Sequence, residues 1–261
     1  MTPYKTALIT GASSGLGRAL AEALAAPGVT LHLGGRNPAR LEEVATLCRA
    51  RGATAVPHRI DVTDRQATRA WIEAAGPLAL VIANAGISGG TGQGQAESEA
   101  QTRAIFAANL DGALNTILPA FDRIATQPPG PDGRRGTIAA VASIAGFLPT
   151  PGAPAYGASK AALDAWTLAS GPAAKARGIH LVSICPGFIR TPMTAANPYR
   201  MPGLIDAAPA AALILRGLDQ NRPRIIFPWW MGALARTLAL LPNAVAMMAR
   251  AGAKPALPDR E

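Results

Sequence analysis

The sequence predicts an α/β protein with one doubly wound parallel sheet of about seven strands and helices on both faces. Three observations support this prediction. Apolar runs of strand length alternate with amphipathic segments of helix length, the pattern of a parallel sheet covered on both sides. A glycine-rich loop follows the first run and opens the first helical segment. The chain has 261 residues, 49% of them hydrophobic, which is enough for one domain with a large core.

The alternation continues along the whole chain, so residues 1–261 are expected to form a single domain. Strands are expected at residues 4–9, 29–33, 54–60, 78–83, 137–142, 180–184 and 224–227. Helices are expected at residues 17–26, 38–51, 64–75, 103–125 and 156–177. The Gly- and Pro-rich residues 89–94 and 127–136 are expected to be surface loops. No linker or internal repeat divides the sequence.

Composition narrows the function classes. The formal net charge is +9, but the basic residues are scattered and the longest basic run is Arg134-Arg135, so nucleic acid is not expected as a partner. Cys48 and Cys185 are too few for a disulfide framework and lack metal-ligand spacing. The histidines His32, His58 and His180 lie in separate strand-like runs, and no metal site is expected. The first residues do not read as a signal peptide, so a cytoplasmic location is expected.

The segment TGASSGLG, residues 10–17, predicts a site for a dinucleotide phosphate. Gly11, Gly15 and Gly17 let the backbone turn tightly and approach a pyrophosphate, which the N-terminus of the following helix favours electrostatically. Ser13, Ser14 and Leu16 of the same loop are also expected to bind the dinucleotide. Its spacing, G-x-x-x-G-x-G, differs from the more familiar G-x-G-x-x-G fingerprint. An ordinary glycine-rich turn between strand and helix is the alternative.

Tyr156 and Lys160 stand four positions apart in AYGASK, residues 155–160. Four positions make one helical turn, so the two side chains share a helix face. A free phenol, with a pKa of about 10, is a poor base near neutral pH, and a nearby ammonium group favours its ionised form. The pair therefore suits acid–base chemistry. On its own it is also consistent with ordinary packing on an amphipathic helix.

Six further motifs follow the glycine loop: DVTD at 61–64, ANAG at 83–86, FAANLDG at 106–112, VASIAG at 141–146, YGASK at 156–160 and CPGFIRTPM at 185–193. In their order and spacing, residues 4–193 resemble the short-chain dehydrogenase/reductase family in its compact form. The resemblance implies a Rossmann fold and an oxidoreductase. Two positions depart from the common pattern: Ala83 replaces a second asparagine and Ala142 a second serine.

The resemblance implies four catalytic residues, Asn109, Ser143, Tyr156 and Lys160. Carbonyl reduction by hydride needs a proton delivered to the developing alkoxide, and Tyr156 is expected to supply it. Lys160 is expected to hold the nicotinamide ribose, Ser143 to bond the substrate oxygen and Asn109 to support a water relay to the lysine. From the residues alone, Ser143 can also be a strand-end cap and Asn109 a polar group of a helix.

The resemblance also implies the contacts of a nicotinamide cofactor. They are Asp61 and Val62 at the adenine, Asn84, Ala85 and Gly86 beneath the ribose, and Pro186, Gly187, Ile189 and Thr191 at the carboxamide. An enzyme that prefers NAD would place an acid after the second strand, where this chain has Gly35 and then Arg36. A guanidinium can bind a 2′-phosphate bidentately. We therefore expect NADP(H), with an exposed arginine at a strand end as the alternative.

The family pattern fades after Met193. Residues 188–206 are expected to form a substrate loop and residues 228–261 an apolar extension, helical over 228–251. This extension is expected to pack on the substrate pocket or on another subunit of a homodimer or homotetramer, and it suggests a hydrophobic substrate. Pro228, Arg236, Pro242 and Asn243 interrupt the apolar run, so no span of about 18 apolar residues remains. A helix on a membrane surface, with Trp229 and Trp230 at the interface, is the alternative.

Two function classes follow. The first is an NADP(H)-dependent oxidoreductase that interconverts a small-molecule carbonyl and a secondary alcohol. The second is a non-catalytic NADP(H) sensor or scaffold on the same fold, because fold alone does not fix function. A sensor needs the glycine loop but no proton donor, so Tyr156 and Lys160 favour the first class.

Overall fold

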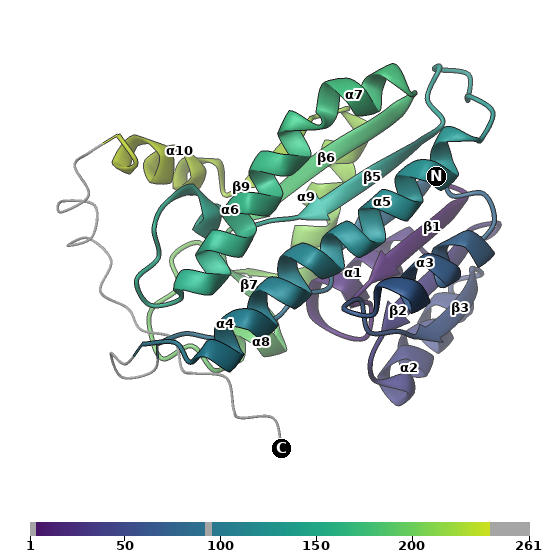
Figure 1. Ribbon diagram of the computed structural model, residues 1–261. Coiled ribbons are helices and arrows are strands. Elements are labelled where there is room, and N and C mark those ends of the chain that lie inside the picture. Colours follow the sequence, from purple (N-terminus) through teal and green to yellow (C-terminus); the bar gives the residue numbers. More distant parts are fainter. Residues whose placement is uncertain (1–3, 92–95, 241–261) are drawn as a thin grey trace.

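Seven parallel strands form one sheet, which confirms the predicted doubly wound class (Figure 1). The computed structural model describes residues 4–91 and 96–240. In spatial order the strands are β3 (Thr54–Arg59), β2 (Thr30–Gly35), β1 (Thr6–Thr10), β4 (Leu80–Ala83), β5 (Gly136–Val141), β6 (Ile179–Pro186) and β9 (Arg224–Phe227). All seven were expected, with bounds shifted by at most a few residues. The chain runs outward from β1 to β3 and then returns to β4, so the strand order reverses between β1 and β4.

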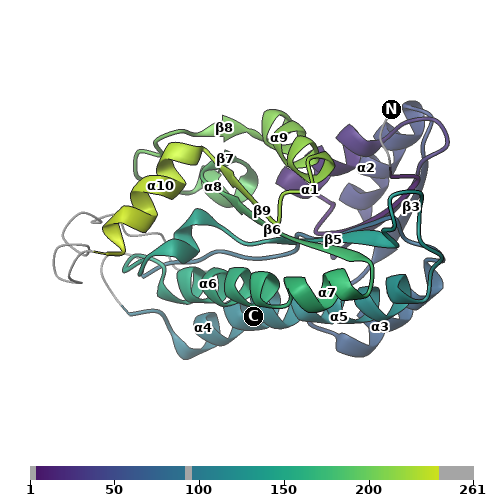
Figure 2. The ribbon, with the colours of Figure 1, turned by 90° about the horizontal axis from the view of Figure 1, so that it is seen from above.

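Helices cover both faces of the sheet (Figure 2). One face carries α1 (Gly15–Leu24), α2 (Pro38–Ala50) and α9 (Ala207–Asp219). The other carries α3 (Arg65–Ala74), α4 (Glu99–Phe106), α5 (Gly112–Ala125), α6 (Pro154–Ala169) and α7 (Gly171–Ala176). The histidines lie in strands, as expected: His32 in β2, His58 in β3 and His180 in β6.

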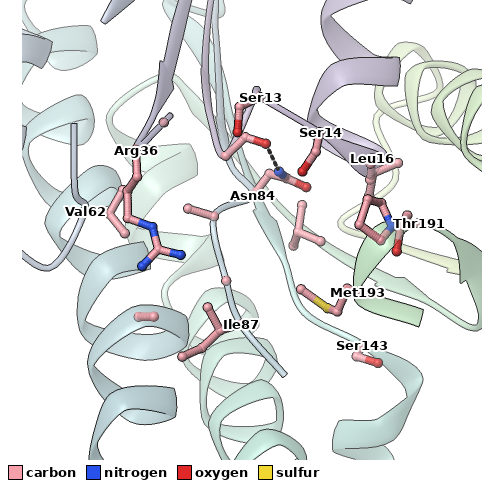
Figure 3. Close-up of a pocket in the computed structure, with 18 of the residues that line it drawn as sticks. Ser13, Ser14, Leu16, Arg36, Val62, Asn84, Ile87, Ser143, Thr191 and Met193 are labelled. Carbon is pink, nitrogen blue, oxygen red and sulfur yellow. Dashed lines mark hydrogen bonds between the residues drawn. The ribbon is translucent and has the colours of Figure 1, made fainter. Parts of the chain in front are cut away.

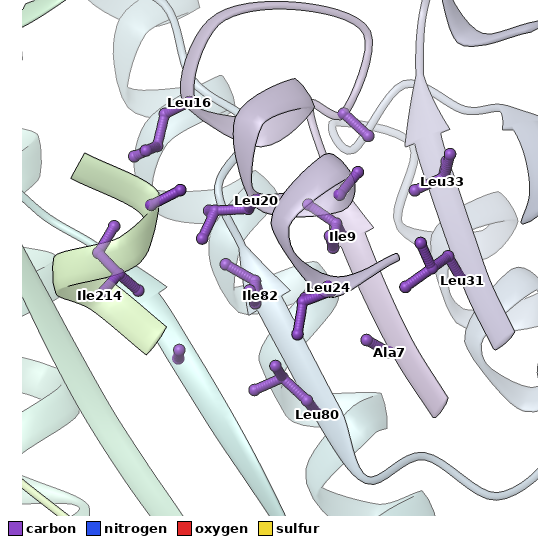
Figure 4. Close-up of a cluster of buried hydrophobic side chains, with 14 of the residues drawn as sticks. Ala7, Ile9, Leu16, Leu20, Leu24, Leu31, Leu33, Leu80, Ile82 and Ile214 are labelled. Carbon is purple, nitrogen blue, oxygen red and sulfur yellow. The ribbon is translucent and has the colours of Figure 1, made fainter. Parts of the chain in front are cut away.

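The face under α1 shows how the sequence builds the core. Leu20 and Leu24, one turn apart on α1, point down onto the strands and are fully buried (Figure 4). They meet Ile9 of β1 and Ile82 of β4, while Ile214 reaches the same cluster from α9. Because alternate residues of each strand face opposite helical layers, nearly continuous apolar strands are required, and this is the pattern that the sequence shows.

The helix expected at residues 103–125 is longer and is interrupted. It begins at Glu99, where the Ser98 hydroxyl accepts a hydrogen bond from the Gln101 amide at 3.1 Å, and it contains a π-helical turn, η1 (Ala107–Asp111). The whole helix, Glu99–Ala125, is the one helix among the described residues long and apolar enough to span a membrane by length and composition. Its most apolar window is 44% buried, and α5 packs on α3, β4 and β5, as a core helix does.

One other expectation needs correction. The helix expected at 156–177 is two helices, α6 and α7, because Pro172 near the start of α7 cannot continue the hydrogen-bond ladder of α6. Three further elements were not expected from the sequence. They are α9 and the short paired strands β7 (Ile189–Arg190) and β8 (Ile205–Asp206), which lie on either side of α8 (Pro192–Ala195) in the chain. These elements belong to the region where no motif guides the interpretation.

The predicted C-terminal helix begins as α10 (Trp229–Leu238), and the rest of the expected extension, residues 241–261, lies outside the described residues. The inner side of α10 packs on the body through Ala235, in a small cluster with Ile144 and Cys185. On the outer side Trp229 is 76% exposed and Leu234 is 52% exposed. The helix therefore presents an apolar face that residues 4–91 and 96–240 do not cover.

Gly146 marks a close approach between α6 and the 3₁₀ turn η2 (Ile144–Phe147) that follows β5. A Cβ atom on this glycine would lie 2.6 Å from the Ala161 amide nitrogen and 2.8 Å from the Lys160 carbonyl carbon. Both are backbone atoms of α6, so they cannot rotate out of the way. Glycine at this position lets η2 and the preceding Ser143 lie directly against α6.

Gly146→Ala is expected to lower the free energy of unfolding by about 1–3 kcal/mol, because the added methyl group overpacks this contact. Urea denaturation measures the change. Gly171→Ala is the matched control, since a Cβ atom there meets nothing within 4 Å, and it is expected to leave stability unchanged or slightly raised. Equal losses in the two variants would contradict the packing argument.

Candidate active site

A cavity of about 630 Å³ opens at the carboxyl ends of the strands, where the strand order reverses. Loops that follow parallel strands meet at this edge, which is why open α/β sheets place their ligands there. The glycine loop after β1, the segment after β4, Ser143 after β5 and the loop after β6 all contribute to its wall. Figure 3 shows side chains from these segments around one space.

The glycine loop has the backbone that the sequence predicts. Gly11 and Gly15 have φ angles of +67° and +54°, a conformation that residues with a Cβ atom rarely adopt. A Cβ atom on Gly17 would lie 2.2 Å from the Gly11 carbonyl oxygen, so only glycine lets α1 start this close to the loop. The first amides of α1 therefore face the cavity side of the loop, where an anion is favoured.

A hydrogen-bonded brace joins this loop to the end of β4. The Thr10 hydroxyl accepts hydrogen bonds from the amides of Asn84 and Ala85, both at 3.0 Å. The Asn84 side chain donates back to the carbonyl oxygens of Thr10 at 3.0 Å and Gly11 at 3.3 Å (Figure 3). Thr10 was not among the expected site residues. In the sequence Thr10 stands directly before Gly11, and nothing there marks its hydroxyl as a hydrogen-bond acceptor.

Basic side chains lie at one end of the cavity. Arg36, directly after β2, lines it with an exposed side chain, and Arg40 on the first turn of α2 lines it as well. Neither guanidinium has an ion-pair partner among the described residues. Gly35 is enclosed, since a Cβ atom on it would lie 3.3 Å from the Ser13 hydroxyl oxygen. This end of the cavity is therefore positive and has no carboxylate on β2.

At the other end, Ser143, Tyr156 and Lys160 line the same cavity. Tyr156 and Lys160 lie on α6 as predicted, with the lysine Nζ atom 5.9 Å from the centre of the phenol ring. Lys160 is only 4% exposed, and its ammonium donates a 2.7 Å hydrogen bond to the Val141 carbonyl oxygen. The Ser143 hydroxyl accepts from the Ala145 amide at 3.1 Å, so it does cap η2 as well as face the cavity.

Burial dominates the electrostatics of this pair. Desolvation lowers the pKa of the Lys160 ammonium to about 8, and nearby Cys185 acts in the opposite direction. Desolvation also raises the pKa of Tyr156, against a smaller lowering by its hydrogen bond with Ser143. The pKa of the phenol is thus shifted upward by burial, opposite to the direction expected from Lys160. Near neutral pH the phenol therefore carries its proton, and the lysine is close to its own pKa.

Asn109 occupies the π-helical turn and is completely buried. Its side chain exchanges two hydrogen bonds with the backbone of Ile87, at 2.8 and 3.0 Å, and donates a third to the Ser159 hydroxyl at 3.1 Å. That hydroxyl in turn donates to the Tyr156 carbonyl oxygen at 2.8 Å. Asn109 therefore braces the strand-four loop against the helix of Tyr156. The water relay to Lys160 stays a prediction.

Nearly all expected site residues meet in this one cavity. Those that line it are Gly11, Ser13, Ser14, Gly15, Leu16, Arg36, Asp61, Val62, Asn84, Ala85, Gly86, Ser143, Tyr156, Lys160, Pro186, Gly187, Ile189 and Thr191. Gly17 and Asn109 stand behind its wall. Arg40, Ile60, Ile87 and Met193 also line the cavity and were not foreseen, because they lie outside the quoted motifs or carry no polar group that marks them.

The comparisons with known proteins agree with this geometry. A family model described as "short chain dehydrogenase" matches residues 5–201. An uncharacterized oxidoreductase of Myxococcus xanthus is 36% identical over 244 residues, which cover 92% of this chain and 94% of that protein.

Solved structures extend the similarity to three dimensions. A short-chain dehydrogenase/reductase from Burkholderia phymatum in complex with NAD superposes with a TM-score of 0.78 at 24% identity, covering 97% of this chain and 98% of that one. A short-chain dehydrogenase from Sphingobium yanoikuyae in complex with NADPH gives 0.76 at 24% identity, covering 92% and 97%. At this identity the two structures support the fold alone.

Thr10→Val is expected to destabilise the protein by about 2 kcal/mol, because the isosteric side chain leaves the amides of Asn84 and Ala85 without an acceptor. Thermal and urea denaturation measure the loss. Thr116→Val is the control: that hydroxyl is equally buried but donates only to the Gly112 carbonyl of its own helix. If both variants lost the same stability, the brace between β1 and β4 would have no special role.

Proposed function

The chain belongs to the short-chain dehydrogenase/reductase family, and from this premise we propose that it is an NADP(H)-dependent oxidoreductase that interconverts a carbonyl and a secondary alcohol. One observation carries the proposal. Tyr156, Lys160 and Ser143 meet at one end of the cavity. At the other end is the glycine loop, beside Arg36 and Arg40, which have no ion-pair partner among the described residues. A protein that only sensed the nucleotide would need the second end but not the first.

The residues present fit a nicotinamide dinucleotide. Gly15 and Thr191 face each other across the loop, since a Cβ atom on Gly15 would lie 3.1 Å from a Thr191 methyl carbon. Any larger residue at Gly15 would fill the cradle in which a pyrophosphate is expected. Asp61 and Val62 then border the adenine, and Pro186 and Gly187 the carboxamide. When bound, the nicotinamide supplies or accepts the hydride.

The protein's own groups handle the proton. Ser143 is proposed to donate a hydrogen bond to the substrate oxygen, and Tyr156 to transfer its phenolic proton to that oxygen as charge develops there. The raised pKa of Tyr156 keeps the phenol protonated at neutral pH, which suits the reduction direction. Lys160, with a pKa of about 8, is able to hold or release a proton in the same range. It is proposed to replenish the proton of Tyr156 and to hold the ribose.

Arg36 supports the choice of NADP(H). It lies directly after β2, where a 2′-phosphate would be placed, and a guanidinium without a carboxylate partner is available for it. A carboxylate at Gly35 would instead repel the phosphate. Arg40 adds a second positive charge to the same end of the cavity.

A hydrophobic substrate is supported by the side chains beyond Ser143 and Tyr156. Ile87 and Met193 line the cavity there, and Phe188 packs edge-to-face on Tyr199 of the 188–206 loop with ring centres 6.2 Å apart. Met231 of α10 reaches the same region, because its sulfur would be 3.1 Å from a Cβ atom on Gly187. Apolar side chains thus gather beside Gly187 and Met193, which favours a hydrophobic substrate.

The exposed face of α10 supports a homo-oligomer, with Trp229 and Leu234 covered by a second copy of the chain. Sedimentation velocity tests this arrangement. A monomer that cosediments with lipid vesicles would favour the membrane surface instead.

Tyr156→Phe is expected to reduce kcat by about a hundredfold to ten-thousandfold, the usual range for loss of a general acid, while NADPH binding changes little. The substrate is first identified by screening ketones with NADPH and alcohols with NADP⁺. Tyr4→Phe is the matched control, because Tyr4 lies in the core before β1, away from the cavity. Near-normal turnover in Tyr156→Phe would refute the proposed chemistry.

Cofactor preference is expected to follow Gly35 and Arg36. The wild-type enzyme should show a kcat/KM at least about tenfold higher with NADPH than with NADH, and Gly35→Asp/Arg36→Ala should reverse the preference. Arg222→Ala, which removes an exposed arginine outside the cavity, is the control and should leave the ratio unchanged. Equal efficiency with both cofactors in the wild type would show that Arg36 does not select.

A further inference from the structure

Behind the reaction centre lies a buried ion pair that the proposed chemistry does not use. Arg224 of β9 donates two hydrogen bonds to the carboxylate of Asp164 on α6, from Nε at 3.0 Å and from Nη2 at 2.6 Å. The same carboxylate accepts from the Ser183 hydroxyl at 2.6 Å and the Cys185 thiol at 3.3 Å, both on β6. Four donor groups on β6 and β9 thus bind the single carboxylate of Asp164.

Its position relates the pair to the site. Asp164 follows Lys160 by four residues and Tyr156 by eight, so all three lie along one face of α6. On the strand side, Cys185 directly precedes Pro186, whose carbonyl oxygen lies 3.5 Å from the Ser143 hydroxyl. The carboxylate therefore joins the helix of the proton donor to the strand that ends in the expected nicotinamide loop.

The burial of this pair sets it apart. The Asp164 side chain is 9% exposed, whereas the carboxylate in every other ion pair of the described residues is at least 23% exposed. Taking two charges out of water costs about as much as their attraction returns, and apolar replacements are often as stable. Stability alone therefore explains poorly why charged residues, Asp164 and Arg224, lie where α6 meets β6 and β9.

The contacts of Arg224 continue toward the substrate side. Its guanidinium lies 5.6 Å from the centre of the Phe147 ring, and Arg236 of α10 lies 4.6 Å from the same ring. Phe147 belongs to η2, the turn that Ser143 caps. One connected set of contacts thus links β9, η2 and α10 to α6 and β6, the two of these elements whose residues line the reacting end of the cavity.

We propose that Asp164 and Arg224 are positioning residues, which hold the Tyr156–Lys160 face of α6 against the end of β6 and keep the charge behind that face balanced. The inference rests on the proposed function of Tyr156. Fixing the helix at this point fixes the distance between the phenol and the serine hydroxyl. Opposite charges in one fork largely cancel each other's effect at the distance of the phenol.

Removing either charge should therefore act on Tyr156 in a predictable direction. Eight residues of helix place Asp164 roughly 12 Å along the axis from Tyr156. At an effective dielectric constant of about 20, one uncompensated charge at that distance shifts a pKa by about one unit. The nearest other titratable group is Lys160, between the two on the same face of α6, with its Nζ atom 5.9 Å from the Tyr156 ring centre. The remaining ones are Cys185 of β6, Tyr199 of the 188–206 loop, Glu97, whose carboxylate accepts from the Ala155 amide, and Arg236. They are the same in every variant below.

The test follows the ionisation of Tyr156 directly by NMR of full-length protein labelled at the tyrosine Cζ carbon. The chain has only three tyrosines, so Tyr156→Phe assigns the signal. Asp164→Asn leaves Arg224 unpaired and should lower the pKa of Tyr156 by about half a unit to one unit. Arg224→Met leaves the carboxylate unpaired and should raise it by a similar amount. Asp164→Asn/Arg224→Met should return it to within about 0.2 units of the wild type, since both charges are then absent.

Turnover supplies the second readout. Each single variant should lose about tenfold or more in kcat with the substrate found by the screen, because the helix is no longer fixed. Arg224→Lys keeps the charge but not the fork, so it should leave the pKa of Tyr156 unchanged and still reduce kcat. This variant keeps the proposal testable if an unpaired buried charge prevents folding. Glu99→Gln, which breaks an exposed pair on α4, is the control and should change neither quantity.

Shifts of the Tyr156 pKa in the same direction in both single variants, or no shift in either, would overturn the proposal and leave the pair as packing alone. So would full turnover in Arg224→Lys and Asp164→Asn. Failure of the proposed function is a separate result, because turnover that survived in Tyr156→Phe would refute the proton-transfer role without altering the NMR titrations.

Discussion

The reversal of strand order between β1 and β4 is the constraint on which the site depends. Because β2 and β3 lie on one side of β1 and the later strands on the other, the loops after β1 and β4 diverge from a shared edge and leave a cavity between them. The brace from Thr10 to Asn84 and Ala85 fixes how far they diverge. The glycine loop, the adenine end and the reacting end of the cavity all take their positions from this edge.

Charge is distributed along the cavity in a way that follows from burial. At the open end, Arg36 and Arg40 are exposed to water and form no ion pair within the described part of the chain. At the closed end, Lys160 loses its hydration and donates a hydrogen bond to the Val141 carbonyl oxygen, and this burial lowers its pKa to about 8. A solvated positive side chain is thus suited to binding an anion, whereas a desolvated one is suited to proton transfer near neutral pH. The distinction comes from depth in the fold rather than from residue type.

The sequence predicted the strands and most of the site because those features have local causes. Periodicity marks the strands, and glycine is required wherever the backbone turns with positive φ, as at Gly11 and Gly15. Features that depend on contacts between distant segments were not predictable in this way. The π-helical turn at Asn109, the acceptor role of Thr10 and the pairing of Asp164 with Arg224 each need a partner from 22 to 75 positions away. α9 was not expected because it follows Met193, beyond the last motif that guided the interpretation.

Asp164 shows how such a distant contact can matter for chemistry. Read along the chain, it is one more polar residue on a helix, and its spacing from Tyr156 and Lys160 has no consequence until β9 supplies Arg224. Once paired with Arg224, it joins α6 to the sheet, and Arg224 continues the contacts through the Phe147 ring to Arg236 of α10. A carboxylate without its guanidinium would disfavour a phenolate on the same helix face, and a guanidinium alone would favour it. The balance of charge between Asp164 and Arg224 therefore links the packing of α6 on the sheet to the protonation state of Tyr156, the proposed proton donor.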